Sequence, residues 1–365
     1  MVDDKLDYQA QIFFNRLQKK FSHLKKWAKR NNIFCYRVYD RDIKEIPLAI
    51  DLYEIIDEAF SANEICAREN SAKEICSRKN SANEICVGEN SANKICAREN
   101  FCKRFVLLYV YSEKSDGWMR SMKRIIAEIF SLADETRIIE KKRVHAKGGS
   151  QYANVQSANE IKGLTNECGK IFFVHLTRAI DTGLFLDARL LRCEIEKESA
   201  QKKVLNLFCY TGSFSVYAAK GGARSIDSVD LSNTYLELAK KNMTLNGFCN
   251  FEKFRFIKSD CKTFLENYSS ESYDIIILDP PTFSNSKMTK TVFSILDDWK
   301  NLVSLCASHL KKNGALYFST NAKQFRLDEN FLAEKKMRAF DLTRKTASED
   351  FKNKIAHRAW KIVFA

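Results

Sequence analysis

Tyr273-Asp-Ile-Ile-Ile-Leu-Asp279-Pro280-Pro281-Thr282-Phe283 is the stretch that indicates the fold of this chain. Its apolar run, 275–278, is typical of a strand buried on both faces of a parallel sheet. The two prolines end the strand, because each has a fixed φ and no N–H to donate. Ligands of open α/β sheets bind at the carboxyl ends of the strands. The stretch therefore predicts a ligand-binding edge, although an apolar strand ended by Asp-Pro also occurs as a simple turn.

Strands alternate with helices on both sides of this stretch. We expect strands at 204–210, 225–231, 253–259, 274–278 and 315–320, and helices at 214–221, 234–246, 263–267 and 292–311. Two more strands are expected near 340–345 and 359–364. Such alternation over about 160 residues predicts a Rossmann-like, doubly wound α/β sheet.

Residues 1–180 predict a smaller α+β domain that precedes this sheet. We expect strands at 34–39, 48–53, 104–111, 137–144 and 170–176, a helix at 118–132, and a bridging helix at 185–200. Residues 61–100 are four tandem decamers, SANEICAREN, SAKEICSRKN, SANEICVGEN and SANKICAREN, which we interpret as a tolerated surface insertion. The chain thus divides into a domain at 1–180 and a second domain at 181–365.

The charge of the chain favours a polyanionic partner. The formal net charge is +14, and seven Lys/Arg with no acid lie between residues 16 and 30. Apolar residues recur at helical spacing over 13–28, which predicts an amphipathic helix with a basic outer face. This face is either simply solvated or contacts nucleic-acid phosphates, and the phosphate contacts would come from Lys19, Lys20, Lys25 and Lys26.

The composition indicates a cytoplasmic protein. The sequence has no apolar run of about 18 residues that could span a membrane, and its start does not resemble a signal peptide. The 12 cysteines show neither Cys-x-x-Cys nor zinc-ligand spacing. We therefore expect free thiols, no metal site and no membrane partner.

Polar side chains are expected at the carboxyl ends of four successive strands, at Asn206, Asp230, Asp260 and Asp279. Gly212 permits a tight turn into the next helix, whose N-terminus offers free N–H groups. Asp230 is placed to accept both hydroxyls of a ribose, and Asp260 to accept the amine of an adenine. Each acid alone could be a helix N-cap. Four together favour an adenosine-containing cofactor, and the absence of G-x-G-x-x-G disfavours a nicotinamide dehydrogenase.

The motifs resemble those of class I S-adenosylmethionine-dependent methyltransferases. Closer still, they resemble 23S (large-subunit) ribosomal RNA guanine-N7 methyltransferases, often the carboxyl-terminal half of a bifunctional protein, of which we expect this chain to be a stand-alone equivalent. The resemblance covers nearly all of the chain except the decamers. It is carried by 204–213 (VLNLFCYTGS), 279–287 (DPPTFSNSK), 181–189 (DTGLFLDAR), 317–321 (YFSTN), and the tail positions Asp350, Phe351, His357 and Trp360.

The resemblance also implies the site residues. The methionine end of S-adenosylmethionine would be lined by Asn206, Phe208, Tyr210 and Gly212, with Phe185 and Asp187 in a lid beside it. Asp279, Pro280, Pro281 and Phe283 would hold the target base, with Asp279 also contacting the cofactor and Phe283 stacked against a guanine taken out of its helix. Further substrate contacts are expected from Thr282, Asn285 and Asn321, although asparagine after a strand is also a common turn residue.

The residues also bear on the reaction. Methylation of cytosine C5 requires a cysteine nucleophile, and related enzymes carry one after the Phe-Ser that ends the fifth strand. Here the sequence reads Phe318-Ser319-Thr320-Asn321. Guanine N7 needs only positioning, because it has an in-plane lone pair. We therefore expect N7 methylation of ribosomal RNA or of a large-subunit assembly intermediate. The alternatives are C5-cytosine or exocyclic-amine methylation of that RNA, or a non-catalytic RNA-binding relative.

Overall fold

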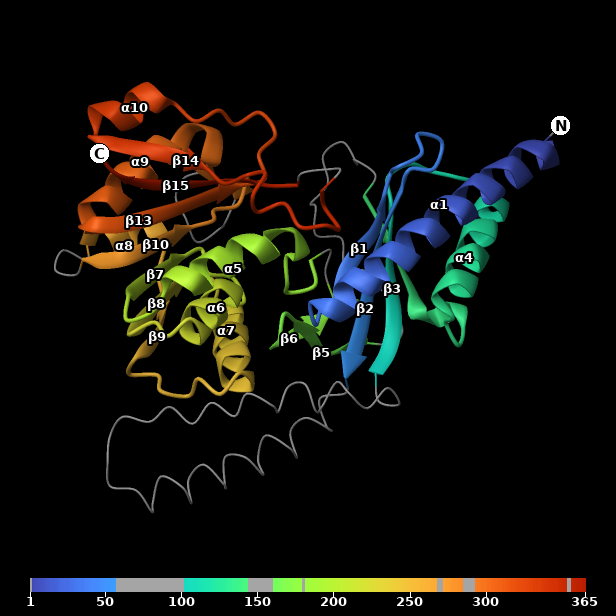
Figure 1. The fold of residues 1–365 in the computed structure, drawn as a ribbon, viewed down its shortest axis with the longest axis horizontal. Helices are drawn as coiled ribbons and strands as arrows, with labels where there is room; N and C mark the ends of the chain where they lie inside the picture. Colours follow the sequence, from blue (N-terminus) through green and yellow to red (C-terminus); the bar gives the residue numbers. More distant parts are fainter. Residues whose placement is uncertain are drawn as a thin grey trace, which may run out of the picture. The chain divides into compact units, whose positions relative to one another are not determined.

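A computed structural model describes residues 2–56, 102–143, 160–178, 181–267, 272–284, 293–352 and 356–365. The chain forms two compact units, Met1–Leu186 and Asp187–Ala365, and each has its own sheet (Figure 1). The decamers at 61–100 lie outside the described residues, as does Asn285. No helix in the described part is long and apolar enough to cross a membrane.

The described part of the second unit contains a seven-stranded sheet in the order β14-β15-β13-β10-β7-β8-β9. Its strands are β7 (Lys203–Leu207), β8 (Ser225–Asp230), β9 (Phe254–Lys258), β10 (Tyr273–Leu278), β13 (Leu310–Thr320), β14 (Met337–Asp341) and β15 (Arg358–Phe364). Neighbouring strands from β13 to β9 are parallel, and β15 is antiparallel to β13 and to β14. The predicted doubly wound sheet is thereby confirmed.

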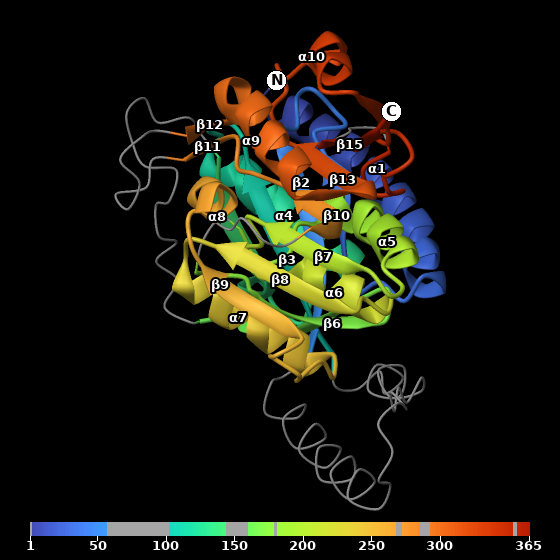
Figure 2. The same cartoon turned by 90° about the vertical axis from the view of Figure 1, so that its left-hand side faces the viewer.

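The helices cover both faces of this sheet. Figure 2 shows α5 (Arg189–Glu198), α6 (Ser213–Lys220) and α7 (Asn233–Leu245) on one face, and α8 (Cys261–Asn267) and α9 (Ile295–His309) on the other. From β7 the chain winds toward β9, and from β10 it winds the opposite way to β13. The carboxyl ends of β7 and β10 are therefore the switch point of the sheet, where ligands of such folds bind.

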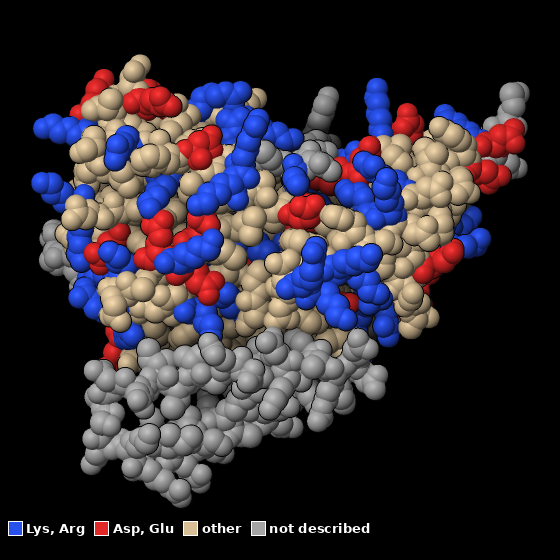
Figure 3. All heavy atoms as spheres, in the orientation of Figure 1, with Lys and Arg blue, Asp and Glu red and all other residues tan. Residues whose placement is uncertain are grey.

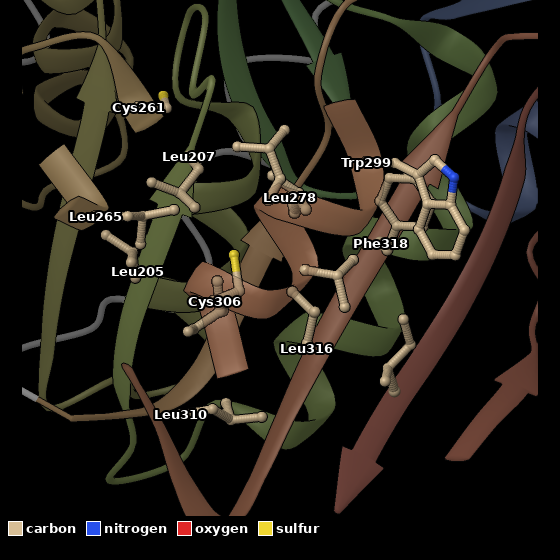
Figure 4. Packing of buried hydrophobic residues seen from close by; sticks show 14 of the residues in the cluster. Leu205, Leu207, Cys261, Leu265, Leu278, Trp299, Cys306, Leu310, Leu316 and Phe318 are labelled. Carbon is tan, nitrogen blue, oxygen red and sulfur yellow. The ribbon is translucent and has the colours of Figure 1, made fainter. Parts of the chain in front are cut away.

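A continuous apolar core lies between the sheet and the second helix layer (Figure 4). Leu278 and Phe318 come from β10 and β13, and Trp299 of α9 lies parallel to Phe318 with ring centroids 6.4 Å apart. Dense packing of this kind leaves the strands little freedom to shift. The residues that follow β10 are consequently held on a rigid support.

The first unit is an α+β fold. Its sheet has the order β4-β3-β2-β5-β6, with β1 paired to β2. The strands are β1 (Cys35–Asp40), β2 (Leu48–Ile56), β3 (Cys102–Val110), β4 (Ile138–Lys142), β5 (Lys162–Glu167) and β6 (Lys170–His175). Helices α1 (Val2–Arg30) and α4 (Asp116–Phe130) bury an apolar stripe against this sheet. Inside that layer, Trp118 Nε1 donates to Gln9 Oε1 at 2.7 Å and so joins the two helices.

Several elements differ from the prediction for local reasons. Strand β5 was missed because its sequence, KGLTNE, shows no apolar alternation. Its hairpin with β6 turns at Cys168 and Gly169, both with positive φ, as in type I′ turns. The strand expected at 340–345 is wrong in position, because β14 ends at Asp341, whose carboxylate accepts from Thr343 N and starts a turn. The short helix α10 (Glu329–Glu334) was not predicted.

Candidate active site

The loop after β7 has an unusual backbone. Phe208, Tyr210 and Gly212 all have positive φ, of 53°, 51° and 72°. Such conformations cost a non-glycine residue about 1–3 kcal/mol each and cluster at functional sites. At Gly212 a Cβ would lie 2.7 Å from Ala239 Cβ, so only glycine lets α6 start this close to α7. Strand β7 consequently ends at Leu207, before the residue at which we expected it to end.

Asp230, the last residue of β8, holds this loop in place. Its Oδ2 accepts from Tyr210 N and its Oδ1 from Ser232 N, both at 2.9 Å. Helix α7 is capped by Ser232, so Asp230 is no N-cap. Burial raises the pKa of its half-buried carboxyl group. Each oxygen keeps a further lone pair, so the carboxylate can still accept the two hydroxyls of a ribose.

Asp260 and Asn206 have local structural partners. Asp260 Oδ1 accepts from Thr263 N at 2.9 Å, so the N-cap interpretation holds here, with Oδ2 remaining for a second donor. Asn206 is 1% exposed and donates through Nδ2 to Ser215 Oγ at 2.8 Å. Asn206 Oδ1 is one of the few buried side-chain atoms in the described residues with no hydrogen-bond partner. Its side chain therefore joins β7 to α6 and retains one unsatisfied acceptor.

Asp279 follows β10 at the switch point. Ser319 Oγ, on the neighbouring strand β13, donates to Asp279 Oδ1 at 2.5 Å. Burial raises the pKa of Asp279, and the Ser319 hydrogen bond opposes that rise. Pro280 is buried beside it and Pro281 is exposed. The two prolines thus carry the chain from the core to the surface without an N–H that would need a partner.

Phe283 presents its ring to solvent. It is 61% exposed, so the simpler interpretation of this residue as a core aromatic is wrong. Phe283 and Ser284 form β11, which pairs antiparallel with β12 (Phe293–Ser294). Phe293 packs on Phe208 with ring centroids 5.7 Å apart, which ties this hairpin to the loop after β7. Thr282 and Asn321 are also exposed, and they follow the carboxyl ends of the neighbouring strands β10 and β13, which end at Leu278 and Thr320.

The two cysteines near these loops are not positioned to act as nucleophiles. Cys209 is 5% exposed and Cys261 is 2% exposed, and burial raises the pKa of both thiols well above the usual value. Only the thiolate is nucleophilic, so both remain unreactive. Cys261 Sγ instead accepts from Phe208 N at 3.2 Å and supports the positive-φ loop.

The predicted lid residues fall in different units. Phe185, 39% exposed, belongs to the first unit. There the preceding Thr182 contacts Tyr53, with 3.0 Å between the two side-chain oxygens. Asp187 starts the second unit, where its Oδ2 lies 3.6 Å from His357 Nδ1.

The basic helix has the predicted amphipathic form. Its apolar stripe is buried, and Lys19, Lys25 and Lys26 are exposed. Lys20 is half-buried and forms an ion pair with Asp42 at 2.9 Å. Figure 3 shows Lys and Arg side chains gathered over the C-terminal part of α1. Another basic stretch, Lys141-Lys142-Arg143, is different, because Lys141 is 1% exposed and burial lowers its pKa to about 8.

Sequence reasoning gave no role to three side chains at this edge. Ser319 and His357 were only parts of matching motifs, and Tyr235, whose ring lies 4.5 Å from that of Tyr210, was not considered. The sequence did contain a signal for Ser319, because this hydroxyl residue lies near the carboxyl end of the strand next to Asp279. Parallel neighbouring strands end at the same edge of the sheet, so such a hydroxyl can reach Asp279. In the described residues, no group of three or more His, Cys, Asp or Glu side chains could hold a metal ion.

Comparison with known proteins identifies the family. Residues 125–349 match the family described as S-adenosylmethionine-dependent methyltransferase. Two solved structures share the fold. One, a methyltransferase complexed with SAH, has TM-score 0.67 and 23% identity. The other, a SAM-dependent methyltransferase from Streptococcus mutans, has TM-score 0.65 and 21% identity. Each alignment covers 97% of this chain and 81% of the other.

Curated relatives extend this match. The chain is 39% identical over 359 residues to "Ribosomal RNA large subunit methyltransferase K/L" of Pseudomonas fluorescens Pf-5, and 36% identical over 360 residues to the protein of that name from Magnetococcus marinus. Both alignments cover 98% of this chain, but they cover only 41% and 43% of the length of the two relatives. The family match confirms the predicted enzyme class and cofactor, and the chain belongs to the S-adenosylmethionine-dependent methyltransferases.

Proposed function

We propose that this chain methylates guanine N7 in large-subunit (23S) ribosomal RNA. The exposed Phe283 ring carries this proposal, because it lies two residues after the prolines that follow Asp279, at the switch point of a methyltransferase sheet. An aromatic ring at this position can stack on a base taken out of its helix. The relatives named for ribosomal RNA, which match almost the whole chain, support the RNA class.

The residues at the edge of the sheet fit S-adenosylmethionine. Asp230 has lone pairs for the ribose hydroxyls, and Asp260 Oδ2 for the adenine amine. The loop of Phe208, Tyr210 and Gly212 leads into the N-terminus of α6, and Asn206 behind it has an unsatisfied oxygen. When bound, S-adenosylmethionine supplies a methyl group on a positively charged sulfur.

The reaction requires little from the protein beyond positioning of the base and the cofactor. Guanine N7 attacks through its own lone pair, so no proton must leave and no general base is needed. The positive charge passes to the guanine ring, and the half-buried Asp279 carboxylate would stabilise it there. Phe283 would hold the ring plane, and Asp279 with the two prolines would keep N7 in line with the methyl group.

The described residues disfavour C5-cytosine methylation. That reaction needs a thiolate on the base side of the site. Ser319, at the carboxyl end of β13, carries a hydroxyl that is hydrogen-bonded to Asp279, and Cys209 and Cys261 are buried. Methylation of an exocyclic amine is the remaining alternative and is separated by the experiment below.

RNA would be presented by the first unit. The exposed ammonium groups of Lys19, Lys25 and Lys26 on α1 can contact phosphates, with a smaller part for the paired Lys20. Thr282, Asn285 and Asn321 are assigned to the target nucleotide, and Phe185 and Asp187 to the cofactor. The proposal places the enzyme in the cytoplasm, where ribosomal subunits are assembled.

Nucleotide mapping tests the proposal. The gene is deleted, and modified nucleotides of 23S ribosomal RNA are compared by mass spectrometry with those of the parent strain. We expect one N7-methylguanine to be lost and to return with the wild-type gene but not with Asp279→Asn. Loss of a 2-methylguanine or a 5-methylcytosine instead would reject N7 as the target atom. A wild-type protein that shows no S-adenosylmethionine binding by calorimetry would reject the enzyme itself.

A further inference from the structure

A histidine lies buried among polar groups of the second unit, and the reaction above gives it no role. His357 is 5% exposed, just before β15. Its Nδ1 lies 3.6 Å from Asp187 Oδ2, and its Nε2 lies 3.2 Å from Thr346 Oγ1. The side chain therefore connects the tail of the chain to the residue that begins the unit.

The Nδ1 atom of His357 is unsatisfied. It is one of the few buried side-chain atoms in the described residues that have no hydrogen-bond partner. Buried polar atoms are nearly always paired, so such an atom requires an explanation. The 3.6 Å to Asp187 is too long for a hydrogen bond. Distances of this length in ligand-free sites commonly shorten when the ligand binds.

The surrounding hydrogen bonds allow two positions for the ring proton of His357. The Thr346 hydroxyl has one proton, and its Oγ1 lies 2.9 Å from the acceptor Leu342 O and 3.2 Å from His357 Nε2. If Thr346 donates to Nε2, the ring proton must be on Nδ1. If Thr346 donates to Leu342, Nε2 donates to Thr346 and the proton of the neutral ring is not on Nδ1. We take the first arrangement, because only that one lets Nδ1 donate to Asp187.

His357 also lies near Asp279. Burial raises the pKa of Asp279, and among its neighbours His357 and Arg192 lower that pKa whereas Asp187 raises it. Asp187 and Asp279, both half-buried, thus lie in the same neighbourhood as His357.

We propose that His357 is a positioning residue for Asp187. Its Nδ1–H closes onto Asp187 Oδ2 when the cofactor binds, and this hydrogen bond holds the carboxylate in the orientation that receives the cofactor. The inference rests on the proposed function, since it takes the Asp187 side of the site to be the cofactor side. It assigns to the tail of the chain a part in cofactor affinity rather than in the reacting bond.

Two isosteric substitutions separate this role from a purely structural one. In His357→Asn the amide nitrogen replaces Nδ1 and can still donate to Asp187, but the shorter side chain no longer reaches Thr346. In His357→Gln the amide replaces Nε2 and can still reach Thr346, but no donor remains at the position of Nδ1. The readouts are the Kd for S-adenosylhomocysteine by calorimetry, the KM for S-adenosylmethionine, and kcat.

We expect His357→Gln to raise the Kd and the KM about tenfold, which corresponds to the loss of one good hydrogen bond, with little change in kcat. His357→Asn should restore both values to within about threefold of the wild type. Equal values for all three proteins would overturn the inference, as would a weaker affinity in the Asn variant than in the Gln variant, because that order assigns His357 to Thr346.

A double-mutant cycle guards against a variant that folds poorly. Asp187→Asn preserves the shape of the side chain, and adding His357→Gln to it should weaken binding no further. Additive losses would overturn the inference. Failure of the wild-type protein to bind S-adenosylhomocysteine would reject the proposed function and this inference with it, whereas wild-type binding with unchanged His357 variants rejects the inference alone.

Discussion

Two opposing effects, which a solvent-exposed carboxylate does not experience, act on the protonation of Asp279. Burial favours its neutral form, and the hydroxyl of Ser319, 2.5 Å from Oδ1, favours its charged form. In the proposed reaction the charged form is active, because it stabilises the positive guanine ring. The hydrogen bond from Ser319 therefore determines the lowest pH at which Asp279 stays charged and the enzyme stays active.

Ser319→Ala should shift the acid limb of the kcat profile to higher pH. The substitution removes an interaction that lowers the pKa of Asp279, so that pKa rises and the carboxylate becomes protonated at a higher pH. The measurement is kcat against pH for methyl transfer to ribosomal RNA. Ser308→Ala, on the exposed side of α9, is the matched control. If the acid limb does not move, the protonation of Asp279 does not limit kcat.

Phe283→Leu should weaken RNA binding without loss of stability. Stacking of a base on an aromatic ring contributes about 1–3 kcal/mol, so we expect the KM for RNA to rise between about fivefold and 150-fold. The thermal midpoint should stay unchanged, since the ring is 61% exposed. Phe340→Leu, on β14 and 47% exposed, is the control. Similar KM values for both variants would remove Phe283 from the base-binding site.

At the scale of elements, α1 presents two different faces. Phe13, Leu17 and Leu24 are buried in the first unit, whereas the lysines of its other face extend into solvent. Lys29 and Arg30 lie in the last turn, where positive charge also suits the helix dipole. The apolar face fixes the helix, so the basic face can be changed without unfolding it.

The triple change of Lys19, Lys25 and Lys26 to Gln should flatten the salt dependence of RNA binding. The slope of log K against log salt concentration is negative, and its magnitude decreases by about 0.7–0.9 for every phosphate that the protein no longer neutralises. Lys20→Gln should contribute less, because its ammonium group is paired with Asp42. The measurement is filter binding to a 23S RNA fragment at several salt concentrations.

A matched control changes three exposed lysines at the other edge of the second unit's sheet, Lys202, Lys220 and Lys312. Lys202 directly precedes β7, Lys220 ends α6 before β8, and Lys312 lies near the start of β13, so all three are away from the carboxyl edge. The control should keep the wild-type slope. An unchanged slope in the α1 variant would assign its basic face to solvation alone.

At the scale of the second unit as a whole, a buried ion pair joins its beginning to its end. Arg189 Nη1 donates to both oxygens of Asp350 at 2.9 and 3.0 Å, and both side chains are fully buried. Ser348 Oγ also donates to Asp350. The two charged residues are 161 positions apart in the chain. The pair therefore exists only in the folded unit and links α5 to the tail that carries His357.

Asp350→Ala should lower the free energy of unfolding of the second unit by about 3–5 kcal/mol, because it leaves a buried guanidinium without its counter-charge. Urea denaturation followed by far-ultraviolet circular dichroism measures this change. The comparison is Glu198→Ala, which removes the exposed pair with Lys361, of similar sequence separation, and should cost less than about 1 kcal/mol. A small effect of Asp350→Ala would mean that water reaches Arg189.

Much of this protein was determined by local sequence alone. Runs of apolar residues ended by Gly, Asp or Pro predicted the alternating strands and helices, and parallel strands bring their carboxyl ends to one edge by geometry. The motif resemblance supplied the cofactor and the enzyme class, both of which the family match confirms. The buried apolar stripe of α1 was predicted from its 3.6-residue period alone.

Only the tertiary structure decided what individual side chains do. Asp260 caps a helix while Asp230 holds a positive-φ loop, although both follow a strand in the same way. Phe283 is exposed, Lys141 is buried, and Ser319 reaches Asp279 from forty residues away. The physical reason is that burial and hydrogen bonding depend on neighbours from distant segments. Periodicity shows which way a side chain points, but not what it meets there.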